Sequence, residues 1–193
     1  MFNASPIILS TKRLLLRELS PTIFNQLFLK KTKQEIMDYL HLKTEQDFEE
    51  MEERYTKGIT TYYTDYKGFQ LLDRDTHQVI GHCDFHTWVP SHRRAEIGYA
   101  MTDEKYKNKG LMQEALESIL TFGFSQMDLY RVEAFVAPGN TPSLQLVQHF
   151  SFKQEGLVRN RYQISGQMQD TLLFSLLKPE FEEWQSNNRP DQD

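Results

Sequence analysis

The chain has 193 residues, of which 39% are hydrophobic, 25% charged and 12% aromatic, a composition typical of a globular protein rather than a disordered, collagen-like or coiled-coil chain. The longest unbroken apolar run, residues 134–137, is far shorter than the about twenty residues of a membrane span, so we expect no membrane association. Asp and Glu number 27 against 22 for Lys and Arg, giving a formal net charge of −5, which weakly favours cationic partners over nucleic acid.

The chain has one cysteine, Cys83, which excludes an intrachain disulfide and fits a reducing compartment. Its first six residues lack the basic and apolar regions of a secretory signal, so we expect a cytoplasmic protein. Neither a long linker nor an internal repeat divides the sequence. We therefore expect one domain over residues 1–184, followed by a polar C-terminal tail over residues 185–193.

Hydrophobic periodicity predicts the elements of the first half of the chain. We expect a strand at 12–19, helices at 21–30 and 34–40, a third helix capped by Thr44, and strands at 68–73, 79–88 and 94–101. Phe48, Met51 and Tyr55 would share one face of the third helix. Cys83 lies on the apolar face of its strand, which predicts a core residue rather than a nucleophile.

In the second half, an apolar stripe from Met112 to Met127 predicts a long helix, followed by a strand at 130–137. Thr141 and Pro142 would be the N-cap and first residue of a helix that ends near residue 150. Strands at 152–159 and 168–177 and a last short helix opened by Pro179 complete the chain. Because helices and strands alternate, the class is α/β or α+β with a mixed sheet.

The most informative segment for function is the loop before the long helix. It contains Lys105, Lys107, Asn108, Lys109 and Gly110. A helix N-terminus presents free backbone N–H groups, a glycine permits close approach, and lysines add positive charge, so the loop is a candidate phosphate site. A solvated basic turn remains the alternative. The sequence contains neither the P-loop nor the dinucleotide-binding glycine motif.

Several motifs with intact order and spacing carry a family resemblance over nearly the whole chain. They lie at residues 11–17, 96–99, 106–112, 114–115, 131–134, 140–143, 149–152, 155–156, 170 and 174–177. This pattern resembles the GNAT acetyltransferases, and it is most similar to their Rim-type branch, named for enzymes that acetylate ribosomal-protein N-termini. The resemblance implies a GNAT fold: a single α/β domain with a twisted, centrally splayed mixed sheet and helices on both faces.

The resemblance also implies a reaction and its partners. Acetyl-CoA would be the cosubstrate, no metal would take part, and the acetyl group would pass directly to a primary amine. The acceptor would be the α-amine of a protein or peptide N-terminus, such as that of a ribosomal or other basic protein. Nucleic acid and membrane would not be partners, and a homodimer is an expectation at the level of the family.

Specific residues follow from the resemblance by position. The coenzyme A pyrophosphate loop would comprise Lys107, Asn108, Lys109, Gly110, Leu111 and Met112. Tyr99, Ala100 and Met101 would pair with the pantetheine arm, and Asn140 matches a pantetheine-binding asparagine. Ser143 would also contact the cosubstrate, and it matches the serine proposed to protonate the departing thiolate. Alternatively, its hydroxyl only forms a hydrogen bond with the backbone of the first helical turn.

The general base is less well defined. Glu96 would act through a water, or it would form a structural ion pair with Arg93 or Arg94. Tyr162 is a further candidate catalytic residue, because it stands where some Rim-type enzymes carry a glutamate, but with a tyrosine there one expected base is missing. A site without a strong base favours an α-amine over a lysine or polyamine, because the α-amine loses its proton more easily.

Other acceptors and functions remain open. A polyamine or an antibiotic amine is the alternative substrate, and a non-catalytic acyl-CoA-binding protein or an interaction module is the alternative class. His82 and His86 would lie about 13 Å apart on one strand face, too far to bind one metal ion. With Asp84 and Trp88 they either line the acceptor side of a cleft or form a solvated sheet face.

Two further features of the sequence concern the charge of a helix and the strain of one backbone position. Acidic residues crowd the third helix, either as a solvated face or as a rim that attracts a cationic substrate; they are Glu45, Asp47, Glu49, Glu50, Glu52 and Glu53. Ser151 replaces the glycine usual before Phe152 in the family. If the backbone there has a positive φ, the serine costs about 1–2 kcal/mol of strain.

Overall fold

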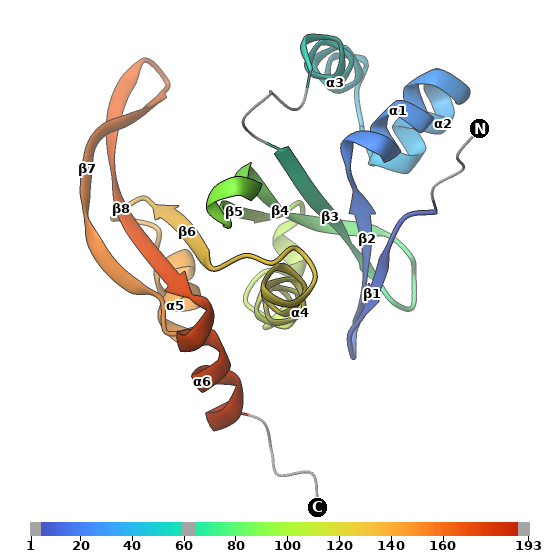
Figure 1. Cartoon of the computed structure of the whole chain (residues 1–193). Coiled ribbons are helices and arrows are strands. Elements are labelled where there is room, and N and C mark those ends of the chain that lie inside the picture. Colours follow the sequence, from blue (N-terminus) through green and yellow to red (C-terminus); the bar gives the residue numbers. More distant parts are fainter. Residues whose placement is uncertain (1–4, 59–64, 189–193) are drawn as a thin grey trace, which may run out of the picture. The chain divides into compact units, whose positions relative to one another are not determined.

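The computed structural model describes residues 5–58 and 65–188, in which six α-helices and eight strands follow one another (Figure 1). The predicted mixed α/β class is confirmed. In chain order the elements are β1 (Ile8–Ser10), β2 (Leu14–Leu19), α1 (Pro21–Lys30), α2 (Lys33–Leu40), α3 (Glu45–Lys57), β3 (Asp65–Asp73), β4 (Val79–Val89), β5 (Arg94–Met101), α4 (Leu111–Ser125), β6 (Arg131–Val136), α5 (Thr141–His149), β7 (Lys153–Ile164), β8 (Gln167–Leu177) and α6 (Lys178–Asn188).

These elements form two compact units. The first comprises Met1–Trp88 with Tyr99–Ser118, and the second Val89–Gly98 with Ile119–Asp193. Strand β5 and helix α4 therefore contribute residues to both units. No described helix has the length and apolar character needed to cross a membrane.

In the first unit, β1, β2, β3 and β4 pair in that order, and each pair is antiparallel. Helices α1, α2 and α3 lie together beside these strands (Figure 1) and share a buried apolar cluster. The cluster comprises Leu19, Ile23, Phe24, Leu27, Ile36, Leu40 and Phe48. Met51 and Tyr55 pack against it, which confirms the predicted face of α3.

Local capping explains where these helices begin. Thr32 and Thr44 each accept a hydrogen bond from the third helical residue, and Glu35 and Asp47 reciprocate, forming two capping boxes. The predicted cap at Thr44 is confirmed. Strand β1 was not predicted, because its three residues are too few to show a period of two.

In the second unit, β5 pairs in parallel with β6, β6 is antiparallel to β8, and β8 is antiparallel to β7. Strand β7 continues past the predicted end at residue 159, through a register shift between Val158 and Tyr162. Ser165 and Gly166, with φ of 50° and 79°, form the predicted turn to β8. Helix α6 extends to Asn188 and therefore includes residues 185–188 of the predicted tail. Residues 189–193 lie outside the described part, so the boundary between domain and tail stays a prediction.

The cap of α5 differs from the prediction. Asn140, not Thr141, is the N-cap: its side-chain oxygen accepts from the Ser143 N–H at 3.2 Å. Thr141 and Pro142 are the first two helical residues. The error is one position, and it arises because Asn and Thr are both good caps and proline is tolerated at either early position.

The end of α5 explains the serine at position 151. The Ser151 N–H donates to Gln148 O and the Phe152 N–H to Val147 O, both at 3.0 Å, which is a Schellman motif. This motif requires a left-handed residue after the helix, and Ser151 has φ of 60°. The strain predicted for a serine at this position is therefore present.

Replacing Ser151 with glycine should stabilise the protein by about 1 kcal/mol, because glycine adopts this conformation without a Cβ penalty. Chemical denaturation compares the variant with the wild type. Asn160→Gly is the matched control: Asn160 has φ of 52°, but asparagine tolerates this region, so the gain should be smaller. A Ser151→Gly variant no more stable than the wild type would contradict the account.

Candidate functional site

The loop between β5 and α4 contains two residues in the left-handed region, Asn108 with φ of 56° and Gly110 with φ of 71°. A Cβ on Gly110 would lie 3.6 Å from Arg13 Nη2, an ordinary contact, so the backbone conformation rather than space favours glycine. The first backbone hydrogen bond of α4 joins Glu114 N to Gly110 O at 3.1 Å. The N–H groups of the preceding residues thus face the loop without helical acceptors, the geometry of an anion site.

Acidic neighbours reduce the positive charge of this loop. Lys107 forms an ion pair with Glu104, and Lys105 Nζ lies 3.2 Å from Asp103 Oδ2. Hydrogen bonds from the backbone and side chain of Lys105 lower the pKa of Asp103. Lys109 is exposed and forms no ion pair within the residues that the structure describes. Backbone N–H groups and Lys109, rather than three free lysines, are therefore available to an anion.

A contact from the chain's N-terminal segment holds the loop in place. Glu114, in the first turn of α4, accepts hydrogen bonds from Thr11 Oγ1 at 2.5 Å and from the backbone N and Nε of Arg13, each at 2.6 Å. Arg13 Nη1 also donates to the carbonyl of Lys109 at 2.9 Å. These contacts were not expected from the sequence, although Thr11, Arg13 and Glu114 all lie in motifs that carry the resemblance.

The predicted pantetheine segment, Tyr99 to Met101, lies against β4 in the first unit. A Cβ on Gly81 would approach Ala100 O to 2.7 Å, so a glycine at position 81 is needed for the close contact. The Thr102 N–H donates to Ile80 O at 2.9 Å. One edge of the segment is thus fixed by β4.

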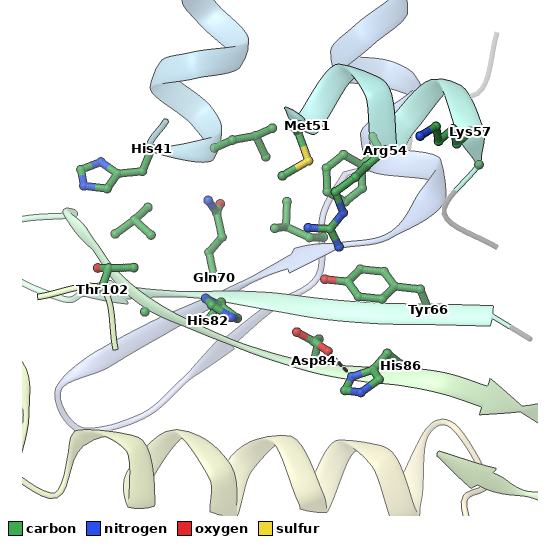
Figure 2. A pocket seen from close by; sticks show the side chains of 16 residues that line it. His41, Met51, Arg54, Lys57, Tyr66, Gln70, His82, Asp84, His86 and Thr102 are labelled. Atoms are coloured by element: carbon green, nitrogen blue, oxygen red, sulfur yellow. Dashed lines mark hydrogen bonds and ion pairs between the residues drawn. The ribbon is translucent and has the colours of Figure 1, made fainter. Parts of the chain in front are cut away.

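A cavity of about 680 Å³ lies in the first unit beside this segment (Figure 2). His82, Asp84 and His86 on β4 line it, as one interpretation of the sequence predicted; Trp88 is not among its lining residues. His86 Nδ1 lies 2.7 Å from Asp84 Oδ1. Gly81 and Thr102 also line the cavity, so it extends to the end of β5.

Tyr66 forms a polar wall of the cavity. Burial, together with the charge of Asp84, raises the pKa of its hydroxyl. A Cβ on Gly68 would lie 2.2 Å from the hydroxyl oxygen, so the tyrosine occupies the space that this glycine leaves free. The cavity wall thus depends on the lack of a side chain at position 68.

Helix α3 turns its basic side toward this cavity. Met51, Arg54 and Lys57 line it, whereas none of the acidic residues of α3 does. Asp47 and Glu50 border a smaller neighbouring hollow of about 340 Å³. The idea that an acidic rim draws in a cationic substrate is therefore not supported at the main cavity, and the solvated-face interpretation fits the acidic residues better.

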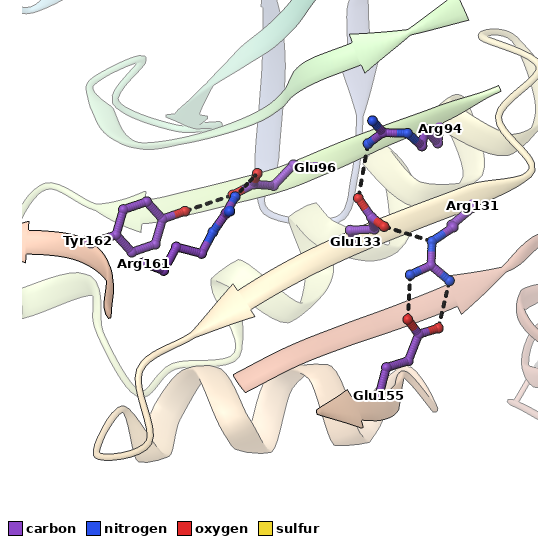
Figure 3. Close-up of polar contacts among 7 residues, drawn as sticks. All are labelled: Arg94, Glu96, Arg131, Glu133, Glu155, Arg161 and Tyr162. Atoms are coloured by element: carbon purple, nitrogen blue, oxygen red, sulfur yellow. Dashed lines mark hydrogen bonds and ion pairs between the residues drawn. The ribbon is translucent and has the colours of Figure 1, made fainter. Parts of the chain in front are cut away.

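In the second unit, the predicted catalytic residues Glu96 and Tyr162 contact each other (Figure 3). The Tyr162 hydroxyl lies 3.1 Å from Glu96 Oε1, and Arg161 Nη2 lies 3.2 Å from Glu96 Oε2. Glu96 is 7% exposed. Burial, together with the charge of Glu96, raises the pKa of Tyr162.

The two candidate ion-pair partners of Glu96, Arg93 and Arg94, pair with other carboxylates. Arg93 Nη2 pairs with Asp128 Oδ1 at 2.7 Å, and Arg94 Nη1 with Glu133 Oε2 at 3.2 Å. Glu96 instead pairs with Arg161, whose guanidinium stacks on the Phe135 ring at 3.6 Å. The sequence contained no signal for this partner, because Arg161 reaches β5 through the long β7–β8 hairpin.

A second charged network in this unit is structural. Arg131 contacts both oxygens of Glu155 at 2.6 Å and also pairs with Glu133, joining β6 to β7 (Figure 3). Hydrogen bonds from Arg131 and Ser175 lower the pKa of Glu155 to about 2. This network joins β6, which pairs with β5, to β7.

Asn140 and Ser143 lie together at the start of α5, as predicted, with the Asn140 side-chain oxygen bound to the Ser143 N–H. Cys83 is fully buried and burial raises its pKa, which confirms a core residue. Within residues 5–58 and 65–188, no three His, Cys, Asp or Glu side chains are grouped to hold a metal ion.

Comparison with known proteins identifies the family. The model of the acetyltransferase (GNAT) domain matches residues 13–153. The uncharacterized N-acetyltransferase YoaA of Bacillus subtilis (strain 168) is 30% identical over 174 residues, 89% of this chain and 97% of that protein. The [ribosomal protein uS5]-alanine N-acetyltransferase of Escherichia coli (strain K12) is 31% identical over 114 residues, 58% of each chain.

A solved structure shows the same fold. The spermidine/spermine N-acetyltransferase SpeG from Vibrio cholerae gives a TM-score of 0.65 at 21% identity and covers 92% of this chain and 98% of that chain. The family match spans most of the sequence, including the loop of Gly110 and the strand of Glu96. The chain therefore belongs to the GNAT family of acetyltransferases.

Proposed function

We propose that this acetyltransferase moves an acetyl group from acetyl-CoA to the α-amine of a protein or peptide N-terminus. The observation that carries the proposal is the loop at residues 107–112, with left-handed residues at 108 and 110 and a helix N-terminus behind it. GNAT enzymes use acetyl-CoA as cosubstrate, and this loop suits its pyrophosphate. The E. coli relative named for alanine acetylation of ribosomal protein uS5 supports an N-terminal acceptor.

The chain offers groups for each part of cosubstrate binding. Backbone N–H groups of Leu111 and Met112, with Lys109, would hold the phosphates, and the edge of Tyr99–Met101 and Asn140 would hold the pantetheine arm. Acetyl-CoA supplies an activated thioester: the amine forms the new C–N bond as the C–S bond breaks, the amine loses a proton, and the thiolate gains one.

We assign the two proton transfers to two residues of the second unit, Glu96 and Ser143. Glu96 would accept the amine proton through a water, and the Tyr162 hydroxyl positions its carboxylate. Ser143 would protonate the leaving thiolate. Arg161 Nη2 lies 3.2 Å from the other carboxylate oxygen of Glu96, so both oxygens have a positioned neighbour.

Proton energetics favour an α-amine. Neutralising an α-amine of pKa about 7.7–8.0 at pH 7 costs about 1 kcal/mol, whereas a lysine of pKa about 10.4 costs about 4.6 kcal/mol. A polyamine faces the same high cost. It would also meet Arg54 and Lys57 in the cavity of the first unit, so the named substrate of the Vibrio neighbour is a poor model for this chain.

A peptide with a free N-terminus and an internal lysine tests the acceptor. At pH 7 we expect acetylation at the α-amine, located by mass spectrometry, and little at the lysine. The same peptide with a blocked N-terminus is the control. Faster acetylation of the lysine, or of spermidine, would contradict the proposal.

The same assay tests the assigned base. Glu96→Gln should lower kcat by about 10²–10⁴-fold, because it removes the assigned base, and it should leave acetyl-CoA affinity unchanged, because cosubstrate binding is assigned to other residues. Glu49→Gln, at an exposed carboxylate of α3 outside the cavity lining, should leave kcat unchanged. An active Glu96→Gln enzyme would refute this role, and acetyl-CoA binding without thiol release from any amine would indicate a non-catalytic binder.

Glu114→Gln should weaken acetyl-CoA binding about tenfold, because the loop loses charge-assisted hydrogen bonds from Arg13. Burial alone would raise the pKa of Glu114, but hydrogen bonds from Thr11 and Arg13 lower it overall. The contact is therefore present at neutral pH and is lost as acidification protonates the carboxylate. Calorimetric titration measures the affinity; exposed Glu117→Gln is the control, and equal affinities in all three proteins would refute this role.

A further inference from the structure

We propose that the acceptor amine carries an anionic group close to it, a carboxylate or a phosphate, and that Arg54 binds this group in the cavity of the first unit. The inference rests on the proposed function and specifies its acceptor. It makes Arg54 a residue that determines specificity and assigns it no part in the proton transfers.

The location of the cavity suits an acceptor. It is lined by Gly81 and Thr102, and Gly81 packs against the carbonyl of Ala100 in the segment assigned to pantetheine. A molecule in the cavity would therefore adjoin the strand end at which the thioester is expected. Its volume of about 680 Å³ can hold the first residues of a peptide or a small amine.

The ionisable side chains that line the cavity are mostly basic. The lining contains one carboxylate, Asp84, against one guanidinium and one ammonium. Asp84 already pairs with His86. His41 and His82 add further nitrogen donors and no negative charge. The sequence of residues 59–64, outside the described part, contains no acidic residue.

Arg54 is the cation placed to bind a ligand. Figure 2 shows its guanidinium pointing into the cavity toward Tyr66. Within the part of the chain that the structure describes, Arg54 has no ion-pair partner, whereas Lys57 is paired with Glu53 at 2.5 Å. A guanidinium offers paired donors that match the two oxygens of a carboxylate or phosphate.

The cavity also provides separate places for the two ends of such a ligand. Arg54 extends from α3, whereas the carboxylate of Asp84 and the ring of His86 belong to β4 on the opposite wall (Figure 2). An anion on Arg54 would be neutralised, while the amine remains on the β4 side of the cavity. A polyamine would place a second cation near Arg54, which like charges disfavour.

Matched peptides test the inference. They share every residue except the second, which is Glu, phosphoserine, Gln or Lys, and spermidine is included. For the wild type we expect kcat/KM at least about tenfold higher with Glu or phosphoserine than with Gln, and lowest with Lys. The Glu and phosphoserine arms show which anion is preferred.

Arg54→Glu should reverse this order and favour the Lys peptide, and Arg54→Lys should retain part of the preference. Lys30→Glu, which changes the net charge equally at an exposed site outside the cavity, should leave the order unchanged. Unchanged acetyl-CoA affinity shows that each variant is folded. Equal kcat/KM for the Glu and Lys peptides, or an order unaffected by Arg54→Glu, would overturn the inference.

The same measurements distinguish failure of the proposed acetyl transfer from failure of the proposed anion binding by Arg54. If acetyl-CoA binds and amines are acetylated without preference for anionic neighbours, only this inference fails. If acetyl-CoA does not bind, the proposed function fails, and direct calorimetric titration of the same peptides then decides the inference: selective binding of the Glu or phosphoserine peptide supports it, and equal binding overturns it.

Discussion

The carboxylate of Glu114 holds the loop to which we assign the cosubstrate phosphates. It holds Thr11 and Arg13 against the first turn of α4, and Arg13 in turn binds the carbonyl of Lys109. A lysine-rich loop that ends in glycine would otherwise be a mobile surface turn. With its backbone held, the left-handed residues at 108 and 110 can present N–H groups in one direction. The positive charge of the lysines would contribute less to anion binding than these N–H groups, because Asp103 and Glu104 already pair with two of the lysines.

The residues proposed for proton transfer and the residues that line the cavity are held in place by different contacts. Glu96 lies on β5 between the Tyr162 hydroxyl and the Arg161 guanidinium. The Arg131–Glu155 pair joins β6, the neighbour of β5, to β7. The cavity of the first unit depends instead on α3 and on two glycines, at 68 and 81, that let Tyr66 and Ala100 approach. On the proposals made above, substitutions in α3 would change acceptor choice without altering the loop assigned to the cosubstrate.

Local signals in the sequence were sufficient for much of the fold. The cap at Thr44 and the periodic faces of the helices follow from neighbouring residues alone, and the strain at Ser151 was expected from the family resemblance. Contacts between distant residues could not be predicted: Arg13 and Glu114 are 101 positions apart, and Glu96 and Arg161 are 65 apart. The basic side of α3 was also missed, because it follows from which side Phe48 buries, whereas the count of acidic residues suggested the opposite charge.

Calorimetric titration of acetyl-CoA into the wild type and Gly110→Glu tests whether the loop at residues 107–112 binds the cosubstrate. The glutamate would place bulk and negative charge at the phosphate position. Gly166→Glu controls for backbone strain, since Gly166 has a similar φ of 79° and open space in the β7–β8 turn. The account predicts binding in the micromolar range for the wild type and the control, and none for Gly110→Glu. Absence of binding to the folded wild type, or equal binding by Gly110→Glu, would contradict it.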